Sequence, residues 1–114
     1  MRDQPLTYTS TPGQQEGTMI LKLVGPLTLE NLFAFQKDLN ETRSKVLILD
    51  LSESPYMDSA GLGALLKYYV SAEKQGRQIL LAGVNDRVKA ILELSHVEGI
   101  LKSFPTPAEA EASL

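Results

Sequence analysis

The chain has 114 residues, of which 43% are hydrophobic and 22% are charged, an ordinary balance for a globular protein that buries one core. Its net charge is −3 and its 11 Lys and Arg residues are scattered, so no basic patch points to a nucleic-acid partner. The absence of cysteine excludes disulfide bonds and thiolate chemistry.

The first quarter of the chain has the pattern of a β-hairpin. Residues 6–11 alternate weakly and are rich in threonine, which predicts an edge strand. Residues 12–17 hold proline, glycine and polar residues without periodicity, which is typical of a turn. Residues 18–24 alternate again, and Gly25-Pro26 ends the run. We therefore expect two antiparallel strands joined by a short loop.

A helix is expected next, starting at Thr28. Thr28 is a suitable N-cap, and Asn31 stands where a capping box would hold an acid. Helical spacing predicts one apolar stripe on this segment, formed by Leu29, Leu32, Phe33, Phe35, Gln36 and Leu39. Residues 46–51 are then nearly all apolar. Such a run predicts a central strand that helices cover on at least part of both faces.

The stretch 57–63 joins this strand to a long helix that continues to about Gln75. Asp58 and Ser59 are both suitable N-caps, because a short side-chain oxygen can accept a free N–H of the first helical turn. A serine here lies at the positive end of the helix dipole, where an anion is tolerated. Gly76 ends the helix. The predicted apolar face holds Leu62, Leu65, Leu66, Tyr69 and Val70, which leaves Gly63, Ala64, Lys67, Tyr68 and Ser71 on other sides.

The rest of the chain continues to alternate between strands and helices. Residues 77–82 predict a strand, and residues 99–101 predict a short last strand. Thr106 is the expected N-cap of a C-terminal helix over 108–114, with Pro107 at its first position. A third helix is expected between the strands at 77–82 and 99–101. Its cap is Asn85 or Asp86, and its apolar positions are Val88, Ile91, Leu92 and Leu94.

The element order β-β-α-β-α-β-α-β-α predicts an α/β fold with right-handed crossovers, in a single domain over residues 1–114. Open α/β sheets place functional residues where their strands end, so the exit of residues 46–51 into the long helix is the expected site. The first residues lack the apolar core of a signal peptide, and no apolar run approaches the roughly 20 residues of a membrane span. We therefore expect a cytoplasmic protein.

Several segments closely resemble the signature of STAS domains, a family named after sulphate transporters and anti-sigma factor antagonists. The strongest likeness lies in residues 46–52 and 56–66, which include the Asp-Ser-x-Gly-Leu-Gly element beginning at Asp58. Residues 25–28 resemble the Gly-x-Leu turn before the family's first helix, and residues 83–88 and 104–110 resemble its later landmarks. The resemblance implies a STAS-type mixed β-sheet of about five strands with about four helices.

The resemblance also implies a regulatory role. In the anti-sigma factor antagonists, the partner anti-sigma factor kinase phosphorylates the serine at the position of Ser59, and the unphosphorylated form binds that partner and frees the sigma factor. Ser59 is thus the implied phosphoacceptor. Many phospho-switched members have aspartate where this chain has Thr28. Together with the helix pattern, the resemblance predicts a partner-binding surface of Asp58, Ser59, Ala60, Gly61, Gly63, Lys67 and Thr28.

Other interpretations stay open for the same residues. Ser59 could serve only as a helix cap, and Gly61 and Gly63 could serve only the close packing of the helix start on the sheet. The domain could be a scaffold or regulatory subunit of a transport or signalling complex without a sigma-factor role. A homodimer is also possible, since the sequence does not define the oligomeric state.

Enzymatic and metal-binding functions are disfavoured. A nucleophilic serine needs a base, His96 is the only imidazole, and Met57 breaks the Gly-x-Ser-x-Gly pattern. Asp50 and Glu53 do not have the spacing of metal ligands. The glycine pair lacks the Gly-Lys-[Ser/Thr] ending of a Walker A motif. We therefore expect neither an enzyme nor a resident metal or cofactor, although an anion could bind at the helix start.

Overall fold

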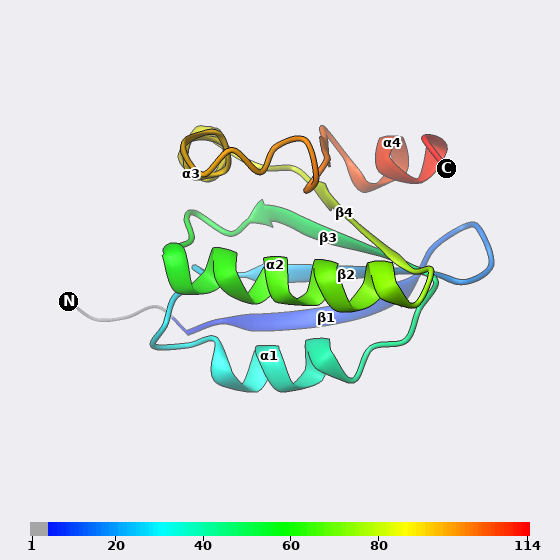
Figure 1. Ribbon diagram of the computed structural model, residues 1–114, viewed down its shortest axis with the longest axis horizontal. Coiled ribbons are helices and arrows are strands. Elements are labelled where there is room, and N and C mark those ends of the chain that lie inside the picture. The colour runs from blue at the N-terminus through cyan, green and yellow to red at the C-terminus, as the bar shows by residue number, and fades with distance from the viewer. Residues whose placement is uncertain (1–4) are drawn as a thin grey trace.

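Five strands form one sheet whose spatial order follows the sequence, β1-β2-β3-β4-β5. Figure 1 shows the first four of these strands in this order. The computed structural model describes residues 5–114. Within that range the strands are β1 (Thr7–Pro12), β2 (Thr18–Val24), β3 (Val46–Glu53), β4 (Gln78–Ala82) and β5 (Ser103–Phe104). The helices are α1 (Phe33–Asn40), α2 (Ser59–Lys74), α3 (Asp86–Leu94) and α4 (Pro107–Ala112). The predicted element order and α/β fold class are confirmed.

β3 lies at the centre of the fold. β1 and β2 form the expected antiparallel hairpin, whereas β2, β3, β4 and β5 pair in parallel. Residues 46–51 are buried throughout, as their apolar run predicted. Leu47, Leu49 and Leu51 belong to the main core with residues of α1, α2 and α3. Val46 and Ile48 belong to a smaller core with Ala110 of α4, so helices cover both faces of β3.

Three of the described helices begin at predicted capping residues. Asp58 caps α2, Asn85 caps α3 and Thr106 caps α4, each through a side-chain oxygen that accepts a backbone N–H. Gly76 follows α2 with a φ of 72°, a left-handed conformation that glycine adopts at low cost. β3 therefore leads into a capped helix at the carboxyl edge of the sheet, where the sequence predicted the site.

The first helix begins at Phe33 rather than at Thr28. Leu32 occupies the N-cap position and makes no side-chain cap bond, so Thr28 is not the cap of α1. The Thr28 N–H instead donates to Asn31 Oδ1 at 2.9 Å, which closes an isolated turn before the helix. As a result, two residues of the predicted apolar stripe, Leu29 and Phe33, are 57% and 68% exposed.

The last strand is Ser103–Phe104 rather than residues 99–101. The N–H groups of Ile100 and Leu101 both donate to the Val97 carbonyl. Turns thus occupy the donors that a strand would use at this point. A short apolar run does not by itself distinguish a strand from a turn that packs its side chains inward.

α2 buries Leu62 and Leu65 as predicted, but its buried face is rotated from the predicted one. Ala64 and Tyr68, which the sequence placed on other sides, are buried, whereas Val70 is 50% exposed. The Tyr68 hydroxyl accepts a hydrogen bond from the Arg77 guanidinium at 2.9 Å, so its polar end is satisfied inside the fold. Leu94, a predicted apolar position of α3, is 80% exposed. Ala64 and Tyr68 therefore do not belong to the surface of α2 that a partner can reach.

Candidate functional site

Asp58 ties the start of α2 to the loop that follows β2. Its Oδ1 accepts the Gly61 N–H at 2.9 Å, which makes Asp58 the N-cap of α2. Its Oδ2 accepts the Leu29 N–H at 3.1 Å, from a residue 29 positions away in the sequence. One carboxylate therefore satisfies a free donor of the helix and holds a second segment beside it.

Main-chain hydrogen bonds reinforce this junction. Leu27 and Met57 form an isolated parallel bridge. The Leu27 N–H donates to the Tyr56 carbonyl at 3.1 Å, and the Asp58 N–H donates to the Leu27 carbonyl at 3.2 Å. Thr28 follows Leu27 directly and is half-buried. The structure thus brings the segment of Thr28 to the segment of Asp58, as a shared site requires.

Ser59 is the first residue of α2, and its side chain is exposed. Among residues 5–114 its hydroxyl has no hydrogen-bond partner, because Asp58 supplies the cap. The hydroxyl also lies at the positive end of the helix dipole, which favours added negative charge. The geometry therefore leaves Ser59 open to modification without any native hydrogen bond being lost.

The two glycines at the helix start have different roles. A Cβ at Gly61 would overlap the Leu27 carbonyl, so glycine lets α2 begin in contact with that segment. A Cβ at Gly63 would meet nothing within 4 Å, and Gly63 is exposed. Gly61 is buried, so the structure gives it a packing role at the helix start. Gly63 leaves an open surface.

Three of the predicted contact residues share one exposed side of α2. Ser59, Gly63 and Lys67 are spaced four residues apart, which places them on the same side of a helix. All three are exposed, and Ala60 beside Ser59 is half-buried. We call the surface formed by Ser59, Gly63 and Lys67 the serine face. It runs from the helix start along the first half of α2.

Exposed hydrophobic side chains flank the start of α2. Leu29 is 57% exposed and Phe33 is 68% exposed. Tyr56 is 38% exposed, and its ring centroid lies 4.8 Å from the Arg87 guanidinium carbon. The sequence did not reveal Leu29 and Phe33 as surface residues, because helical spacing assigned both to a buried stripe. The Asn31 side chain, a signal for a separate capped turn, could have revealed them.

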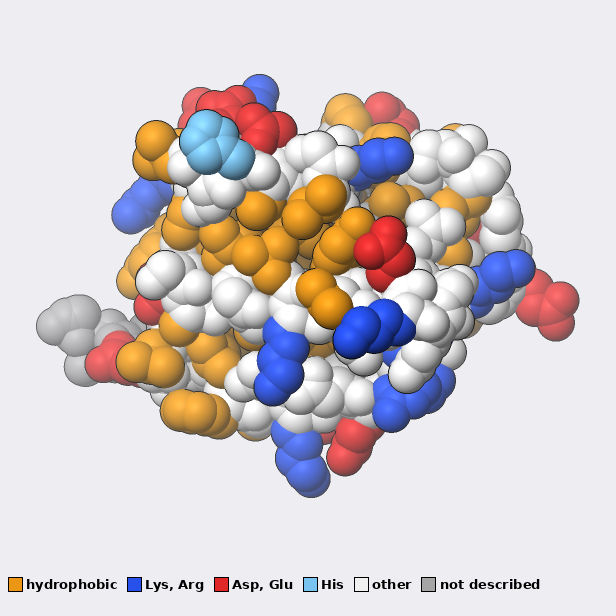
Figure 2. Space-filling view, viewed as in Figure 1, with side chains coloured by type: hydrophobic (Ala, Val, Ile, Leu, Met, Phe, Trp, Pro, Cys, Tyr) orange, Lys and Arg blue, Asp and Glu red, His pale blue; other side chains and the backbone are white. Residues whose placement is uncertain are grey.

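A second apolar area covers the side of the molecule formed by α2 and α3. Figure 2 shows hydrophobic side chains gathered at the centre of this face. Large exposed hydrophobic residues in and after these helices are Val70, Leu94 and Ile100. Tyr69 and Ile100 also line one hollow of about 300 Å³, whose other lining includes the charged residues Glu73, Arg77 and Lys102. Apolar surface therefore continues along α2 beyond its first turn.

The other polar side chains considered as candidates have local partners. Asp50 accepts the Ser52 N–H at 3.0 Å, and Glu53 pairs with Lys22 at 2.7 Å. Within residues 5–114, no cluster of three or more His, Asp or Glu is arranged to hold a metal ion. His96 lies just after α3, exposed, with a φ of 59°. The described residues place no base within hydrogen-bond reach of Ser59, as a serine nucleophile would require.

The STAS domain profile matches residues 11–110. The chain belongs to the STAS domain family. A protein of Thermotoga neapolitana, named provisionally as an anti-sigma factor antagonist, is 30% identical over 100 residues, which cover 83% of this chain and 88% of that protein. The intermembrane phospholipid transport system binding protein MlaB of Escherichia coli is 34% identical over 74 residues, which cover 65% of this chain and 76% of that protein.

The solved structures include STAS proteins with the same fold. The crystal structure of a provisionally named anti-sigma factor antagonist of Thermotoga maritima matches with a TM-score of 0.83 at 26% identity. The match covers 93% of this chain and 92% of that chain. The STAS-type mixed sheet with its helices, expected from the resemblance, is thereby confirmed.

Proposed function

We propose that this protein is an anti-sigma factor antagonist that binds an anti-sigma factor kinase and is switched off when the kinase phosphorylates Ser59. The unphosphorylated form would hold the kinase and free the sigma factor, so regulating sigma-factor-dependent transcription in the cytoplasm. The observation that carries the proposal is the Ser59 hydroxyl, which is exposed and free of hydrogen bonds at the first residue of a capped helix. Membership of the STAS family, with a 30% identical relative named for this role, supports it.

Phosphorylation at Ser59 would change the charge of the site without dismantling it. A phosphate adds roughly −1.5 to −2 charges. The cap of α2 and the link to Leu29 both belong to Asp58, so neither is lost when Ser59 is modified. The helix dipole offsets part of the added charge. A partner pressed onto Ser59 would instead meet two adjacent anionic groups that have to lose water, which strongly disfavours docking.

The docking surface would combine the serine face with the apolar side chains beside it. Gly63 leaves room for a partner to approach α2 closely. Leu29 and Phe33 provide exposed apolar area for the centre of an interface, where apolar and aromatic side chains carry most of the binding energy. Lys67 would lie at the far end of the contact and suits an acidic group on the partner.

A second candidate function is a STAS subunit of a transport or signalling complex without a sigma-factor role. The 34% identity to MlaB, a protein named for a phospholipid transport system, favours it. Thr28, where many phospho-switched members have aspartate, also favours it. In residues 5–114, no helix combines the length and apolar character of a membrane crossing. In this role the serine face would dock another subunit of the complex.

Partner capture from the source cell, with the captured proteins identified by mass spectrometry, separates these two functions. The bait proteins are the wild type, Ser59→Asp and Ser59→Asn, where the Asn variant matches the size of Asp without its charge. We expect the wild type and Ser59→Asn to retain a serine kinase that Ser59→Asp does not retain. Recovery of transport subunits in place of a kinase would favour the second function.

The captured kinase then provides a direct test of modification. With ATP, the purified kinase should add one phosphate to the wild type at Ser59 and none to Ser59→Ala, as measured by intact-mass and peptide mass spectrometry. Equal retention of the kinase by Ser59→Asp and Ser59→Asn would contradict the switch, and so would phosphorylation of the Ser59→Ala variant at the wild-type level.

A further inference from the structure

β1 is an edge strand that is accessible along its length. It stands first in the sheet order and pairs with β2 alone among the strands of residues 5–114. Its side chains are exposed except that of Tyr8, which is half-buried. An exposed edge presents unpaired N–H and C=O groups that can bind a further strand.

The alternation of hydrogen bonds shows which backbone groups of β1 are unpaired. The Gly13 N–H donates to the Thr18 carbonyl at 2.8 Å, so odd-numbered residues on this side of the hairpin direct their groups toward β2. The even-numbered residues of β2 are the partners of these residues, so the odd-numbered residues of β2 direct their backbone groups toward β3. The Gly25 N–H agrees with this, since it donates to the Glu53 carbonyl at 3.0 Å. The outward groups of β1 therefore belong to its even-numbered residues, Tyr8, Ser10 and Pro12.

This edge carries little of the protection that edge strands usually have. Natural edges are blunted by charged side chains, by bulges or by proline. The β1 sequence Thr-Tyr-Thr-Ser-Thr-Pro holds no charged residue, and its register with β2 continues without a shift. Pro12 removes one outward donor at the end of the strand. The outward groups of Tyr8 and Ser10 remain complete.

Two copies of β1 can pair with each other only in registers that keep each side chain on its own face. A two-fold axis normal to the sheet meets this condition when it passes through a residue, and the axes through Thr9 and Ser10 pair the most residues of β1. If the axis passes through Ser10, Tyr8 lies opposite Pro12 of the second copy, and Pro12 has no N–H to donate. Centred on Thr9, Tyr8 lies opposite Ser10 of the second copy, and both residues have complete outward groups.

We propose that this protein self-associates through β1, with the two strands antiparallel and the two-fold axis at Thr9. On each side of the axis, the backbone groups of Tyr8 in one copy and Ser10 in the other copy form two reciprocal hydrogen bonds. The two sheets thereby become one continuous sheet. The two Thr9 residues form a non-hydrogen-bonded pair with Cα atoms about 4.5 Å apart. Thr7 lies opposite Thr11, so the pairs nearest the axis bring no like charges together.

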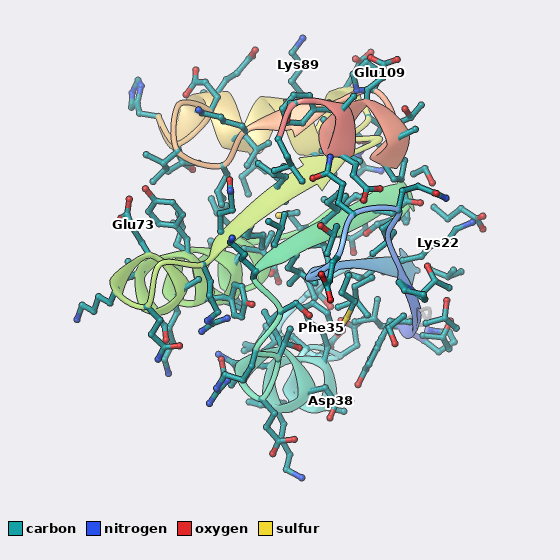
Figure 3. All side chains as sticks on the ribbon, turned by 90° about the vertical axis from the view of Figure 1, so that its right-hand side faces the viewer. Lys22, Phe35, Asp38, Glu73, Lys89 and Glu109 are labelled. Carbon is teal, nitrogen blue, oxygen red and sulfur yellow. The ribbon has the colours of Figure 1, made fainter. Side chains whose placement is uncertain are left out.

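The face on which the Thr9 side chains meet is open. Thr9 is paired with Lys22 in the hairpin register, so both side chains lie on the same face of the sheet. Figure 3 shows Lys22 on the side of the sheet away from α1 and α2. α4 covers this face mainly over β3, β4 and β5. It also reaches the hairpin turn after β1, where the Gln15 N–H donates to the Glu111 carboxylate, but it does not extend to Thr9. No described helix therefore stands between the two Thr9 residues.

Disulfide trapping tests this register, because the chain has no native cysteine. Thr9→Cys should form a covalent dimer under mild oxidation, since a disulfide tolerates Cα separations of about 4.4–6.8 Å. Ser10→Cys is the matched control: in the Thr9 register its two Cα atoms lie more than about 7 Å apart, with side chains on the other face. Faster cross-linking of Ser10→Cys than of Thr9→Cys would overturn the register.

Sedimentation of the unmodified chain tests the association itself. The wild type should show a concentration-dependent shift toward dimer on raising the protein to about 1 mM, because a single strand pair makes a small interface. Thr9→Glu should abolish this shift, since two carboxylates would meet at the axis while each monomer gains an attraction to Lys22. Thr9→Val should retain the shift.

A wild type that stays monomeric throughout this range would overturn the proposal, and so would a Thr9→Glu variant that dimerises as the wild type does. Ser59→Asp should dimerise normally, because β1 and the serine face are separate surfaces. Failure of the proposed switch at Ser59 is thus distinguishable from failure of the dimer.

Discussion

The α-carbon of Gly61 lies against the carbonyl group of Leu27, so that any side chain at this position would overlap that carbonyl. The contact joins residues that are far apart in the sequence and sets how closely the loop after β2 approaches the first turn of α2. Asp58 can then bond to both Gly61 and Leu29. The exposure of Ser59 follows from this arrangement, because the cap is already provided.

Replacing Gly61 tests how far the site depends on that contact. Gly61→Ala should lower the free energy of unfolding by about 1–3 kcal/mol, because the added methyl forces the backbone apart. Gly63→Ala is the matched control and should raise it by about 0.5–1 kcal/mol, since alanine is the better helix former and the space is open. Urea denaturation measures both. A Gly61→Ala variant as stable as the wild type would refute the contact.

Asp58 should stabilise two segments at once. Asp58→Ala should cost about 0.5–2 kcal/mol through loss of the N-cap alone. It should also speed hydrogen exchange at the Leu29 amide, which bonds to the other carboxylate oxygen. Asp58→Asn keeps an acceptor for the cap and should lose less stability. Unchanged exchange at Leu29 in the alanine variant would show that the link between the segments is not formed in solution.

Acidic substitution at Ser59 should leave the fold intact. Ser59→Asp should change stability by no more than about 0.5 kcal/mol, because the residue is exposed and makes no bond, and because the helix dipole favours the charge. Gln75→Asp places the same charge at the other end of α2 and should destabilise by about 0.3–1 kcal/mol. Thermal unfolding followed by circular dichroism compares the two. A strongly destabilised Ser59→Asp would mean that charge at this position damages the helix itself.

The Tyr8 phenol should make stability depend on alkaline pH. Its hydroxyl donates to Asp38 Oδ2 at 2.6 Å, and this bond, with burial, raises its pKa from 10.0 to about 12. Figure 3 shows Asp38 on α1, near Phe35, whose ring lies edge-on to Tyr8 at 5.3 Å. Above pH 10 the unfolded chain loses the phenolic proton more readily than the folded one. The bond from Tyr8 to Asp38 therefore contributes fully to the free energy of unfolding below pH 10, and this contribution disappears as the pH rises toward 12.

Melting temperatures between about pH 9 and pH 12 test this dependence. In the Tyr8→Phe variant the melting temperature should fall less steeply with rising pH than in the wild type. Some fall should remain, because burial and the bond to Glu73 also raise the pKa of Tyr69. A wild type and a Tyr8→Phe variant with parallel profiles would contradict the role of the bond to Asp38.

Much of the fold and the position of the site were predictable because their signals are local. The apolar run at 46–51 identifies a buried central strand, and capping side chains at Asp58, Asn85 and Thr106 locate three helix starts. A cap and the helix that it begins lie within a few residues of each other. Ser59 could therefore be placed at a helix start from the sequence, and the STAS resemblance implied a phosphoacceptor at this position.

On the helices and the loops beside them, tertiary contacts decided which residues are buried. Gly61 and Gly63 look equivalent in the sequence, yet the first packs on Leu27 and the second faces solvent. Tyr68 is buried because Arg77 satisfies its hydroxyl from beyond the end of α2. Leu29 and Phe33 are exposed because a separate turn precedes α1. Helical periodicity records only spacing within one segment, whereas burial depends on which distant segment packs against it.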